Sequence, residues 1–404
     1  MTSKIESNQT NADLSDQASL NKAPIVKILV VGVGGGGSNA VDCMIKAGVQ
    51  HVGFVAVNTD FQALERSISP IRLQIGKKIT GGFGAGADPE IGERSALESE
   101  IFIKDMLKDA EIVFVTAGMG GGTGTGAAPV IARIAKEMGK LTIGVVTKPF
   151  DIEGGVRTNA AQMGIANLSK NVDTLVIVPN EKLIEQVAEL TMIEAMAYAD
   201  EMLHQAIRAI TGVILDKSVI NVDFADLKRI LKGMGTAHMG IGYGKGQNKT
   251  LDAVKSAVAS KLLETTITGA SKAILHFLLA PNVRLDEVNK ASKMVKDELA
   301  ENPEFIFGFG VDDRLEDEVF VTIIATGFDQ QANHRGQQQQ SRPRNGEPYK
   351  PPQPPESSTL GGLFDDDDDD YVQGGNNHSK SNTRTDVGGG TGSSFLDALK
   401  NKNR

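Results

Sequence analysis

The sequence predicts an α/β fold built on a doubly wound, mostly parallel sheet, and three observations support this. Apolar, β-branched runs of strand length alternate with helix-like segments up to about Asn180. These runs are continuously apolar, as is typical of strands that are buried on both faces. Glycine-rich loops follow three of the runs, at the carboxyl ends of strands, where sheets of this kind bind their ligands.

The first glycine-rich loop, residues 32–41, follows a strand predicted over 25–32 and leads into a helix. Its Gly32, Gly34 and Gly37 match the G-x-G-x-x-G pattern, in which a close backbone and a helix N-terminus receive a phosphate group. The pattern alone is weak, but its position between a strand and a helix makes a phosphate site plausible.

The next two strands are predicted over 52–60 and 71–75. Asp60 ends the first of them, about where a dinucleotide-binding fold places the carboxylate that holds a ribose. An NAD-dependent oxidoreductase is therefore an alternative at this point. The second strand leads into another glycine-rich loop, residues 80–92, where Asp88 precedes a proline and has the composition of a helix N-cap.

Glycine is most concentrated after the strand predicted over 111–116. Residues 118–126 hold six glycines and two threonines, so the backbone can turn through positive φ and bring its N–H groups close to a ligand. A helix is predicted to follow, with Pro129 near its first turn and its positive end behind these N–H groups. A ligand with several anionic oxygens, such as a di- or triphosphate, suits this chemistry.

Two further strands are predicted over 141–150 and 172–183. Between them, Glu153 and Arg157 stand at a helix start, four residues apart, which is the spacing of an exposed helical ion pair.

A long helix is predicted over 192–215, because apolar residues recur there at helical spacing. On propensity alone, Asp200 and Glu201 near its start are helix-dipole partners or part of a solvated face. The apolar face consists of Met192, Ala195, Met196, Ala199, Leu203, Ile207 and Ile210.

After the long helix, a loop enters a short helix within residues 219–231. Asp223 and Asp226 stand at its start, where capping explains them. Residues 240–328 mix strands and helices and predict a separate α+β unit. Its clearest elements are helices near 251–264 and 284–299 and a strand over 318–327.

Composition narrows the class of protein. The 404 residues carry 42 basic and 51 acidic side chains, and a net charge of −9 argues against a nucleic-acid or membrane-surface binder held by charge. The single cysteine, Cys43, cannot form an intramolecular disulfide, which fits a reducing cytosol. Because no segment has the apolar length of a signal peptide or a membrane span, we expect a cytoplasmic protein without direct membrane insertion.

Both ends of the chain predict disorder. The amino-terminal tail, residues 1–23, is polar, and residues 329–390 are too rich in Gln, Pro, Gly, Asn and Ser to bury a core. The final segment, 391–404, predicts a docking peptide that folds on a partner. It combines an apolar helical face with basic residues behind it: Phe395, Leu396, Leu399, Lys400, Lys402 and Arg404.

In combination, these loops resemble the FtsZ family, the bacterial tubulin homologues that act as cell-division GTPases. GMGGGTGTG, residues 118–126, is similar to the tubulin-family signature loop, which dehydrogenases do not share. The matches stand in the family's order from about Pro24 to Phe328, and so many in sequence are specific. The other matching motifs are GVGGGGSNAV, GFGAGADPEIG, EGGVR, NVDFAD and VTIIATGF.

The resemblance implies a Rossmann-like GTP-binding domain that a long central helix joins to a smaller α+β domain, with disordered tails. The implied parts are a tail at 1–23, the GTP-binding domain at 24–191, the central helix at 192–215, the α+β domain at 216–328 with the catalytic loop at its start, a linker at 329–390 and the docking peptide at 391–404.

The resemblance also implies the residues that bind GTP or GDP. Glu153 would hold the ribose hydroxyls, and Arg157 would lie against the nucleotide. Asp200 would read the base, because a carboxylate accepts both N1–H and the exocyclic amine of guanine, a pair that adenine does not offer. Asn180 is a lesser candidate for the base edge. The loop contacts would come from Gly35, Gly36, Gly37, Ser38, Asn39, Gly122, Thr123 and Gly124.

The implied catalytic residues are Asp223 and Asp226. In the family this loop enters the nucleotide site of the next subunit, where its carboxylates orient the attacking water and help to hold magnesium, with no metal site formed by the protein alone. Hydrolysis would then require head-to-tail homopolymers, which form the division ring at midcell. Membrane-tethering and regulatory division proteins would bind the C-terminal peptide.

The chain departs from the family pattern at three places. Met196 stands where the family usually has an aromatic ring against guanine, and the loop 188–191 lacks a proline and is one residue short. The segment 391–404 lacks the acidic, apolar and proline residues that usually lead into it. A diverged FtsZ-like scaffold that binds guanine nucleotide with little turnover therefore stays an alternative.

Overall fold

The computed structural model describes residues 27–184, 191–215, 224–260 and 267–328. Its strands form one sheet in the order β3-β2-β1-β4-β5-β6-β7-β10-β8-β9. The strands are β1 (Ile28–Val33), β2 (Val52–Asn58), β3 (Ile71–Gln74), β4 (Ile112–Gly118), β5 (Leu141–Lys148), β6 (Thr174–Pro179), β7 (Gly235–Lys245), β8 (Lys272–Leu279), β9 (Glu304–Val311) and β10 (Glu318–Thr326).

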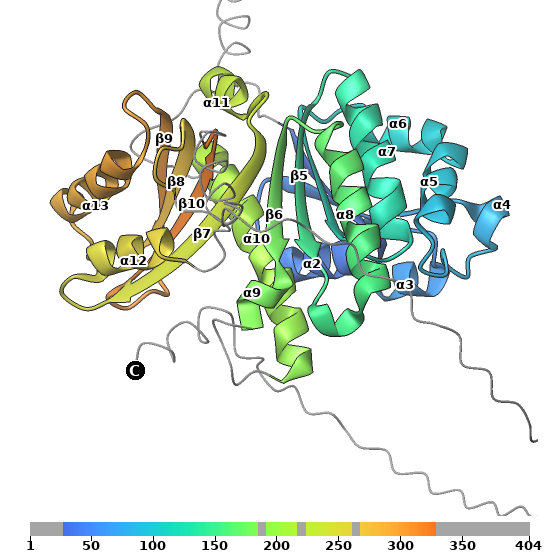
Figure 1. Ribbon diagram of the computed structural model, residues 1–404, viewed down its shortest axis with the longest axis horizontal. Coiled ribbons are helices and arrows are strands. Elements are labelled where there is room, and N and C mark those ends of the chain that lie inside the picture. The colour runs from blue at the N-terminus through green and yellow to red at the C-terminus, as the bar shows by residue number, and fades with distance from the viewer. Residues whose placement is uncertain (1–26, 185–190, 216–223, 261–266, 329–404) are drawn as a thin grey trace, which may run out of the picture. The chain divides into compact units, whose positions relative to one another are not determined.

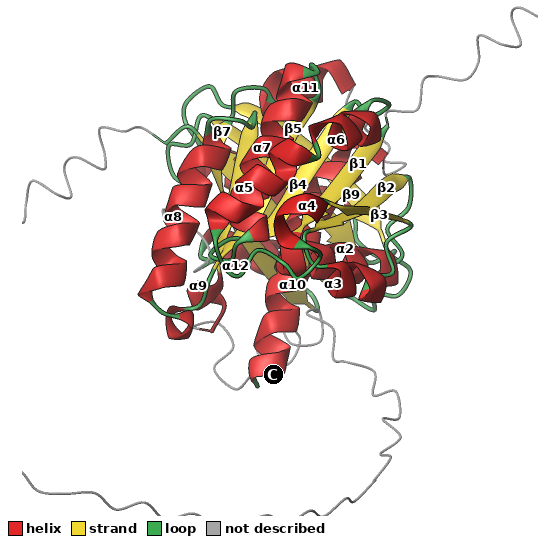
Figure 2. Ribbon diagram, turned by 90° about the vertical axis from the view of Figure 1, so that its right-hand side faces the viewer, coloured by secondary structure: helices red, strands yellow, loops and turns green. Residues whose placement is uncertain are grey.

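The first six strands are parallel, and helices cover both of their faces, as the sequence predicts. Figure 2 shows α5, α7 and α8 in front of this part of the sheet, while α2 packs on β1, β2 and β4 from the other side. The helices here are α2 (Gly34–Lys46), α3 (Phe61–Arg66), α4 (Lys77–Thr80), α5 (Pro89–Glu98), α6 (Glu100–Leu107), α7 (Thr123–Glu137), α8 (Gly155–Ser169) and α9 (Asn180–Ile184), with a 3-10 turn η1 (Asp151–Glu153).

The predicted long helix is α10 (Met192–Leu215), which lies between the two halves of the sheet in Figure 1. It packs against α2, β5 and β6 on one side and against β8, β9 and β10 on the other. The residues of its predicted apolar face from Ala195 to Ile210 are buried, except that Met196 is 40% exposed. Within the described ranges, no helix combines the length and the apolar character that crossing a membrane requires.

The α+β region is a continuation of the same sheet. Strand β7 pairs in parallel with β6 over its first residues and antiparallel with β10 over the rest. The Thr326 hydroxyl donates to the Thr236 carbonyl at 2.6 Å, which joins β10 to β7, and the Thr174 hydroxyl of β6 donates at 2.6 Å to the carbonyl of Leu231, which ends α11 (Phe224–Leu231) just before β7. The remaining helices are α11 (Phe224–Leu231), α12 (Lys249–Val258) and α13 (Leu285–Glu298).

Several predictions fall outside the described residues. These are the two disordered tails, the docking peptide 391–404, most of the loop 188–191, and Asp223. Asp226 belongs to α11, but its side chain is not among those described.

Candidate nucleotide-binding site

A cavity of about 430 Å³ lies at the carboxyl ends of β1, β4, β5 and β6, the edge at which doubly wound sheets bind ligands. Its volume is within the range of small-ligand pockets. It unites most of the predicted site residues: Gly35, Gly36, Asn39, Gly122, Thr123, Gly124, Glu153, Arg157, Asn180 and Asp200.

Two of the glycine-rich segments are helical, which corrects the prediction of loops there. Helix α2 begins at Gly34 and α7 at Thr123, so Pro129 lies inside α7 and not at its start. Each glycine weakens a helix by about 1 kcal/mol relative to alanine, and close packing compensates for this loss. A Cβ atom on Gly34 would lie 2.8 Å from the nitrogen of Gly124, so a side chain there would separate the two helices.

The N-termini of α2 and α7 thus meet at the cavity, and neither has a side-chain hydrogen bond at its N-cap in the described structure. The first N–H groups of a helix have no partner within the helix, and the helix dipole adds positive potential at the same end. Two such ends side by side suit a multiply charged anion, because backbone N–H groups can hold it without a charged side chain.

Glycines of one turn of α2 have different surroundings. A Cβ atom on Gly35 would meet nothing within 4 Å and would project into open space at the cavity, whereas one on Gly37 would lie 2.4 Å from the Thr116 carbonyl oxygen. Gly37 and Ser38 are buried and do not line the cavity, and the Ser38 hydroxyl has no hydrogen-bond partner. Their nucleotide contacts therefore stay predictions.

This difference gives a matched pair of substitutions on one helix. Gly35→Ala will leave the free energy of unfolding unchanged or raise it by up to about 1 kcal/mol, while weakening GTP binding at least about tenfold, because the methyl group occupies ligand space. Gly37→Ala will destabilise the chain by about 1–3 kcal/mol, because it overpacks against a backbone carbonyl. Thermal unfolding and nucleotide titration of both variants measure this, and equal destabilisation by the two would contradict it.

Glu153 and Arg157 form the predicted ion pair on the cavity wall. The Arg157 guanidinium donates to Oε2 of Glu153, and the Phe150 N–H donates to Oε1 at 2.9 Å. Arg157 is 49% exposed, so the pair adds only a few tenths of a kcal/mol to stability. Its position against the cavity fits a polar clamp, and the ribose role of Glu153 stays a prediction.

At the α10 end of the cavity lie two hydrogen-bond acceptors, the carboxyl group of Asp200 and the side-chain oxygen of Asn180. Burial, and to a smaller extent the charge of Asp42, raises the pKa of Asp200 to about 7. The Asn180 Oδ1 atom is buried and has no hydrogen-bond partner among the described residues. A ligand edge that carries N–H donors would satisfy both groups. The prediction that Asp200 and Glu201 lie on a solvated face is wrong, because α2 packs over this part of α10 and buries much of both side chains.

Two acids away from the cavity cap helices, one of them as predicted. Asp88 caps α5 and accepts the Glu90 N–H at 2.8 Å, as predicted. Asp60 caps α3 and accepts the Ala63 N–H at 3.1 Å. Since Asp60 does not line the cavity, the residue that motivated a dinucleotide-binding alternative has a structural role.

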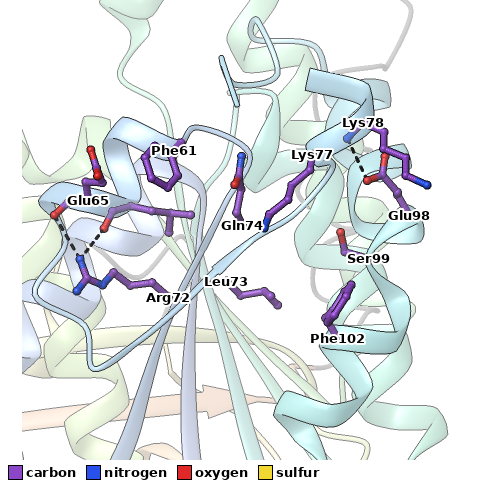
Figure 3. A pocket seen from close by; sticks show the side chains of 11 residues that line it. Phe61, Glu65, Arg72, Leu73, Gln74, Lys77, Lys78, Glu98, Ser99 and Phe102 are labelled. Carbon is purple, nitrogen blue, oxygen red and sulfur yellow. Dashed lines mark hydrogen bonds between the residues drawn. The ribbon is translucent and has the colours of Figure 1, made fainter. Parts of the chain in front are cut away.

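A larger cavity of about 760 Å³ lies between α3, β3 and α6 at the edge of the sheet (Figure 3). Some of its polar groups already have partners: the Lys78 N–H donates to Glu98 at 3.2 Å, and Arg72 donates to the Leu64 and Glu65 carbonyls at 3.4 Å. It contains none of the predicted site residues. We therefore assign the nucleotide to the smaller cavity.

Comparison with known families identifies the family of the chain. Residues 27–188 match the GTPase domain of the Tubulin/FtsZ family, and residues 235–329 match the C-terminal domain of the FtsZ family. Together the two matches span more than half of the chain. The chain belongs to the FtsZ family.

Solved structures place it within this FtsZ family. An FtsZ dimer from M. jannaschii is 40% identical, with a TM-score of 0.74 over 78% of this chain and 92% of that chain. A point mutant of M. jannaschii FtsZ gives the same identity and TM-score over 79% of this chain and 96% of that chain. GDP-bound CetZ1 from Haloferax volcanii shares the fold at 23% identity, with a TM-score of 0.64 over 78% of this chain and 98% of that chain.

Sequence reasoning about this FtsZ-family site missed several residues of the cavity wall. Gly118, Met119 and Gly121 belong to the same glycine-rich run as the predicted residues and were identifiable from it. Others lie at the end of β5 or line the cavity from α10, and no pattern distinguishes them from neighbouring core residues. These are Thr147, Pro149 and Ala199.

Proposed function

We propose that this FtsZ-family chain binds GTP and GDP in the 430 Å³ cavity and hydrolyses GTP to GDP and phosphate as part of head-to-tail filaments. The paired N-termini of α2 and α7 receive the phosphates, and the Asp200 end receives guanine. Two relatives support nucleotide binding and assembly: CetZ1 was solved bound to GDP, and CetZ2, at 21% identity, as a GTPγS-bound protofilament.

Magnesium fits this site as a companion of the nucleotide. The cavity wall offers the Thr123 hydroxyl as an oxygen ligand, and Mg²⁺ usually takes few protein ligands while keeping waters and phosphate oxygens. When bound, the ion neutralises charge that develops on the transferred phosphoryl group. Thr123 is held by a hydrogen bond of 2.7 Å between its hydroxyl and that of Thr59.

The observation that carries the proposal is that the described part of the cavity lacks an acid to orient water. Its described lining contains two carboxylates. Glu153 is bonded to Arg157 and Phe150, and Asp200 faces the base end. The described side chains of α11 do not line the cavity, and the side chain of Asp226 is not among those described. Asp223 and Asp226 would complete the site of the next chain, and this contact generates a filament.

A concentration series tests this proposal. The rate of phosphate release per chain will rise with protein concentration, because only assembled chains have complete sites, and it will level off once most chains are in filaments. Sedimentation with GTP and with GDP, run in parallel, measures assembly. A rate per chain that is the same for dilute monomers and for concentrated protein would exclude hydrolysis across the subunit contact.

In the cell, we assign these filaments to the division ring at midcell in the cytoplasm. The segment 391–404 would bind the membrane-tethering and regulatory division proteins through its apolar face. Deleting this segment should leave GTP hydrolysis and sedimentation of the purified chain intact while a fluorescent fusion no longer forms rings. Ring formation by the shortened chain would show that another segment recruits the tether.

One observation favours a second function, that of a guanine-nucleotide-binding scaffold with little turnover. Met196 lines the cavity and is 40% exposed, so the base end lacks a flat ring to stack on guanine. A scaffold would co-assemble with an active homologue and release little phosphate alone. Sustained turnover by the purified chain would exclude it.

A further inference from the structure

A second cluster of reactive side chains lies where α2 packs on α10, next to the nucleotide cavity. Cys43 of α2 faces Glu201 of α10, with 3.5 Å between Sγ and Oε2. His204 lies one turn further along α10, with 3.2 Å between Nδ1 and Oε1 of Glu201. One sulfur, one nitrogen and one oxygen atom of these residues lie within 4.8 Å of one another.

These three side chains are close enough together to surround one metal ion. With Zn–S, Zn–N and Zn–O bonds of about 2.3, 2.0 and 2.0 Å, tetrahedral angles separate sulfur from oxygen by about 3.5 Å and nitrogen from oxygen by about 3.3 Å. The ligand atoms lie within 4.8 Å of one another, and because Cys43 and His204 contact different oxygens of Glu201, they must move together around one of these oxygens when an ion binds. Glu201 and His204 form a Glu-x-x-His pair on one helix, the spacing with which helical bundles present metal ligands, and the third ligand comes from a facing helix.

Hydrogen bonding alone explains the cluster incompletely. Cys43, His204 and Gln205 all donate to the same Glu201 carboxylate, Gln205 at 2.6 Å. Burial opposes ionisation of Glu201, but these bonds outweigh it and hold its pKa below the usual range. However, His204 is 97% buried, and among the described residues its Nε2 atom has no hydrogen-bond partner, so the network leaves one of its two ring nitrogens unsatisfied.

The cluster also carries an excess of negative charge. Burial first, and then the charges of Glu201 and Asp200, raise the pKa of the Cys43 thiol to about 12. The charge of Asp42 also raises the pKa of Asp200. Lys46 lowers the pKa of Cys43, but its effect is smaller than those of burial and the two carboxylates. A divalent cation reverses this balance, because it stabilises both the thiolate and the nearby carboxylates.

We propose that Cys43, Glu201 and His204 bind a divalent transition-metal ion, of which Zn²⁺ is the natural candidate, with water as the fourth ligand. Thiolate and imidazole favour zinc over magnesium or calcium, which prefer oxygen ligands. Binding displaces the proton of the Cys43 thiol to solvent. The ion joins α2, which carries a phosphate-binding end, to the part of α10 that carries Asp200.

Cobalt titration of the full chain tests the site, since Co²⁺ replaces zinc and absorbs light. The chain contains one cysteine, so any sulfur-to-cobalt charge-transfer band must come from Cys43. We expect the band to saturate at one ion per chain, together with intense visible bands typical of tetrahedral cobalt, and to disappear when Zn²⁺ is added. Absence of a charge-transfer band at saturating Co²⁺ would overturn the proposal.

Three variants separate this site from other metal binding. Cys43→Ser should abolish the band and weaken Zn²⁺ binding by more than about 100-fold, while circular dichroism and GTP binding confirm that it folds. Glu201→Gln, which keeps a hydrogen-bonding side chain, should weaken Zn²⁺ binding similarly. Replacing the Asp365–Asp370 run by asparagines is the control and should leave the band unchanged. Unaltered Zn²⁺ stoichiometry and affinity in Cys43→Ser would place the ion elsewhere.

Discussion

Replacing Asp226 by asparagine will slow GTP hydrolysis by about 100-fold or more, while GTP affinity and filament formation change little. A side chain that orients or activates the attacking group contributes about 10²–10⁴-fold to a rate, and the amide keeps the shape but loses the charge. Affinity is spared because, in the proposed arrangement, Asp226 acts on the nucleotide of the neighbouring chain and makes none of the contacts that hold the nucleotide of its own chain. Phosphate release, nucleotide titration and sedimentation measure the three properties separately.

A matched control variant replaces an aspartate by asparagine at a different, exposed position. Asp297 is exposed on α13, and Asp297→Asn should hydrolyse GTP like the unaltered chain. If both variants retain full activity, the catalytic assignment of Asp226 is wrong. If Asp226→Asn no longer sediments with GTP, the residue supports the subunit contact more than the chemistry.

Mixing two inactive variants tests whether the acid acts across the contact. Gly35→Ala should have an impaired nucleotide site and an intact Asp226, whereas Asp226→Asn should have the reverse. In the mixture, a chain with Asp226→Asn supplies an intact GTP site, and a neighbouring chain with Gly35→Ala supplies an intact Asp226. Such a contact contains every required group, so the mixture should hydrolyse GTP faster than either variant alone. No gain at any ratio, with co-sedimentation confirmed, would argue that each chain acts on its own nucleotide.

The sequence predicts those parts of this structure that depend on local pattern. The bounds of α10 agree with the apolar periodicity, because a helix that packs on both sides requires it along its whole length. The N-cap role of Asp88 is likewise local, since it depends on the residues directly after it. The position of β7 is different, because its pairing with both β6 and β10 joins segments far apart in the chain.

The candidate site likewise has features that local sequence pattern predicts and features that depend on packing between distant segments. Its phosphate end could be predicted, because a run of glycines between a buried strand and a helix has few other physical explanations. The residues at which α2 and α7 begin within these runs could not be predicted. Glycine disfavours helix, and close packing such as that of Gly34 on Gly124 reverses this preference. The burial of Asp200 and Glu201 was also unpredictable, because it depends on where α2 lies.

We expect the largest change in ligand specificity from Asp200→Asn, which should bind xanthosine triphosphate (XTP) in preference to GTP. Guanine presents two N–H donors to the carboxylate, and an amide can accept one of them but opposes the other with its own N–H₂. Xanthine carries an oxygen in place of the exocyclic amine, so the amide matches it. GTP affinity should fall by about 100–1,000-fold, because two donors then face each other in a buried site.

Displacement of a fluorescent nucleotide analogue by GTP or by XTP measures this change of preference in the unaltered chain and in Asp200→Asn. Asn180→Ala is a useful comparison, because it removes a neighbouring acceptor without placing a donor opposite the base. It should weaken GTP binding less than Asp200→Asn and should not favour XTP. An unchanged order of preference in Asp200→Asn would mean that guanine does not lie against α10.

The pKa of Asp200 makes the same assignment testable by pH. Guanine requires the carboxylate form, and in the nucleotide-free chain burial raises the pKa of this group to about 7. GTP affinity should therefore fall about tenfold for each pH unit below 7, because a proton must first leave. Asp200→Asn lacks this ionisation, so subtracting its pH profile removes the titration of the nucleotide phosphates. Parallel profiles for the two proteins would exclude Asp200 as the group that reads the base.

Stability of the nucleotide-free chain should change in the opposite direction to GTP affinity. Because the pKa of Asp200 rises from 3.8 to about 7 on folding, the stability that its protonated form contributes is complete below pH 3.8 and is lost as pH rises through 7. Asparagine cannot ionise, so Asp200→Asn should be more stable than the unaltered chain above pH 7, by up to about 4 kcal/mol, and nearly equal to it at pH 4. The Asp200 carboxylate should therefore destabilise the nucleotide-free chain and strengthen GTP binding, which fits a role in ligand recognition and not in stability.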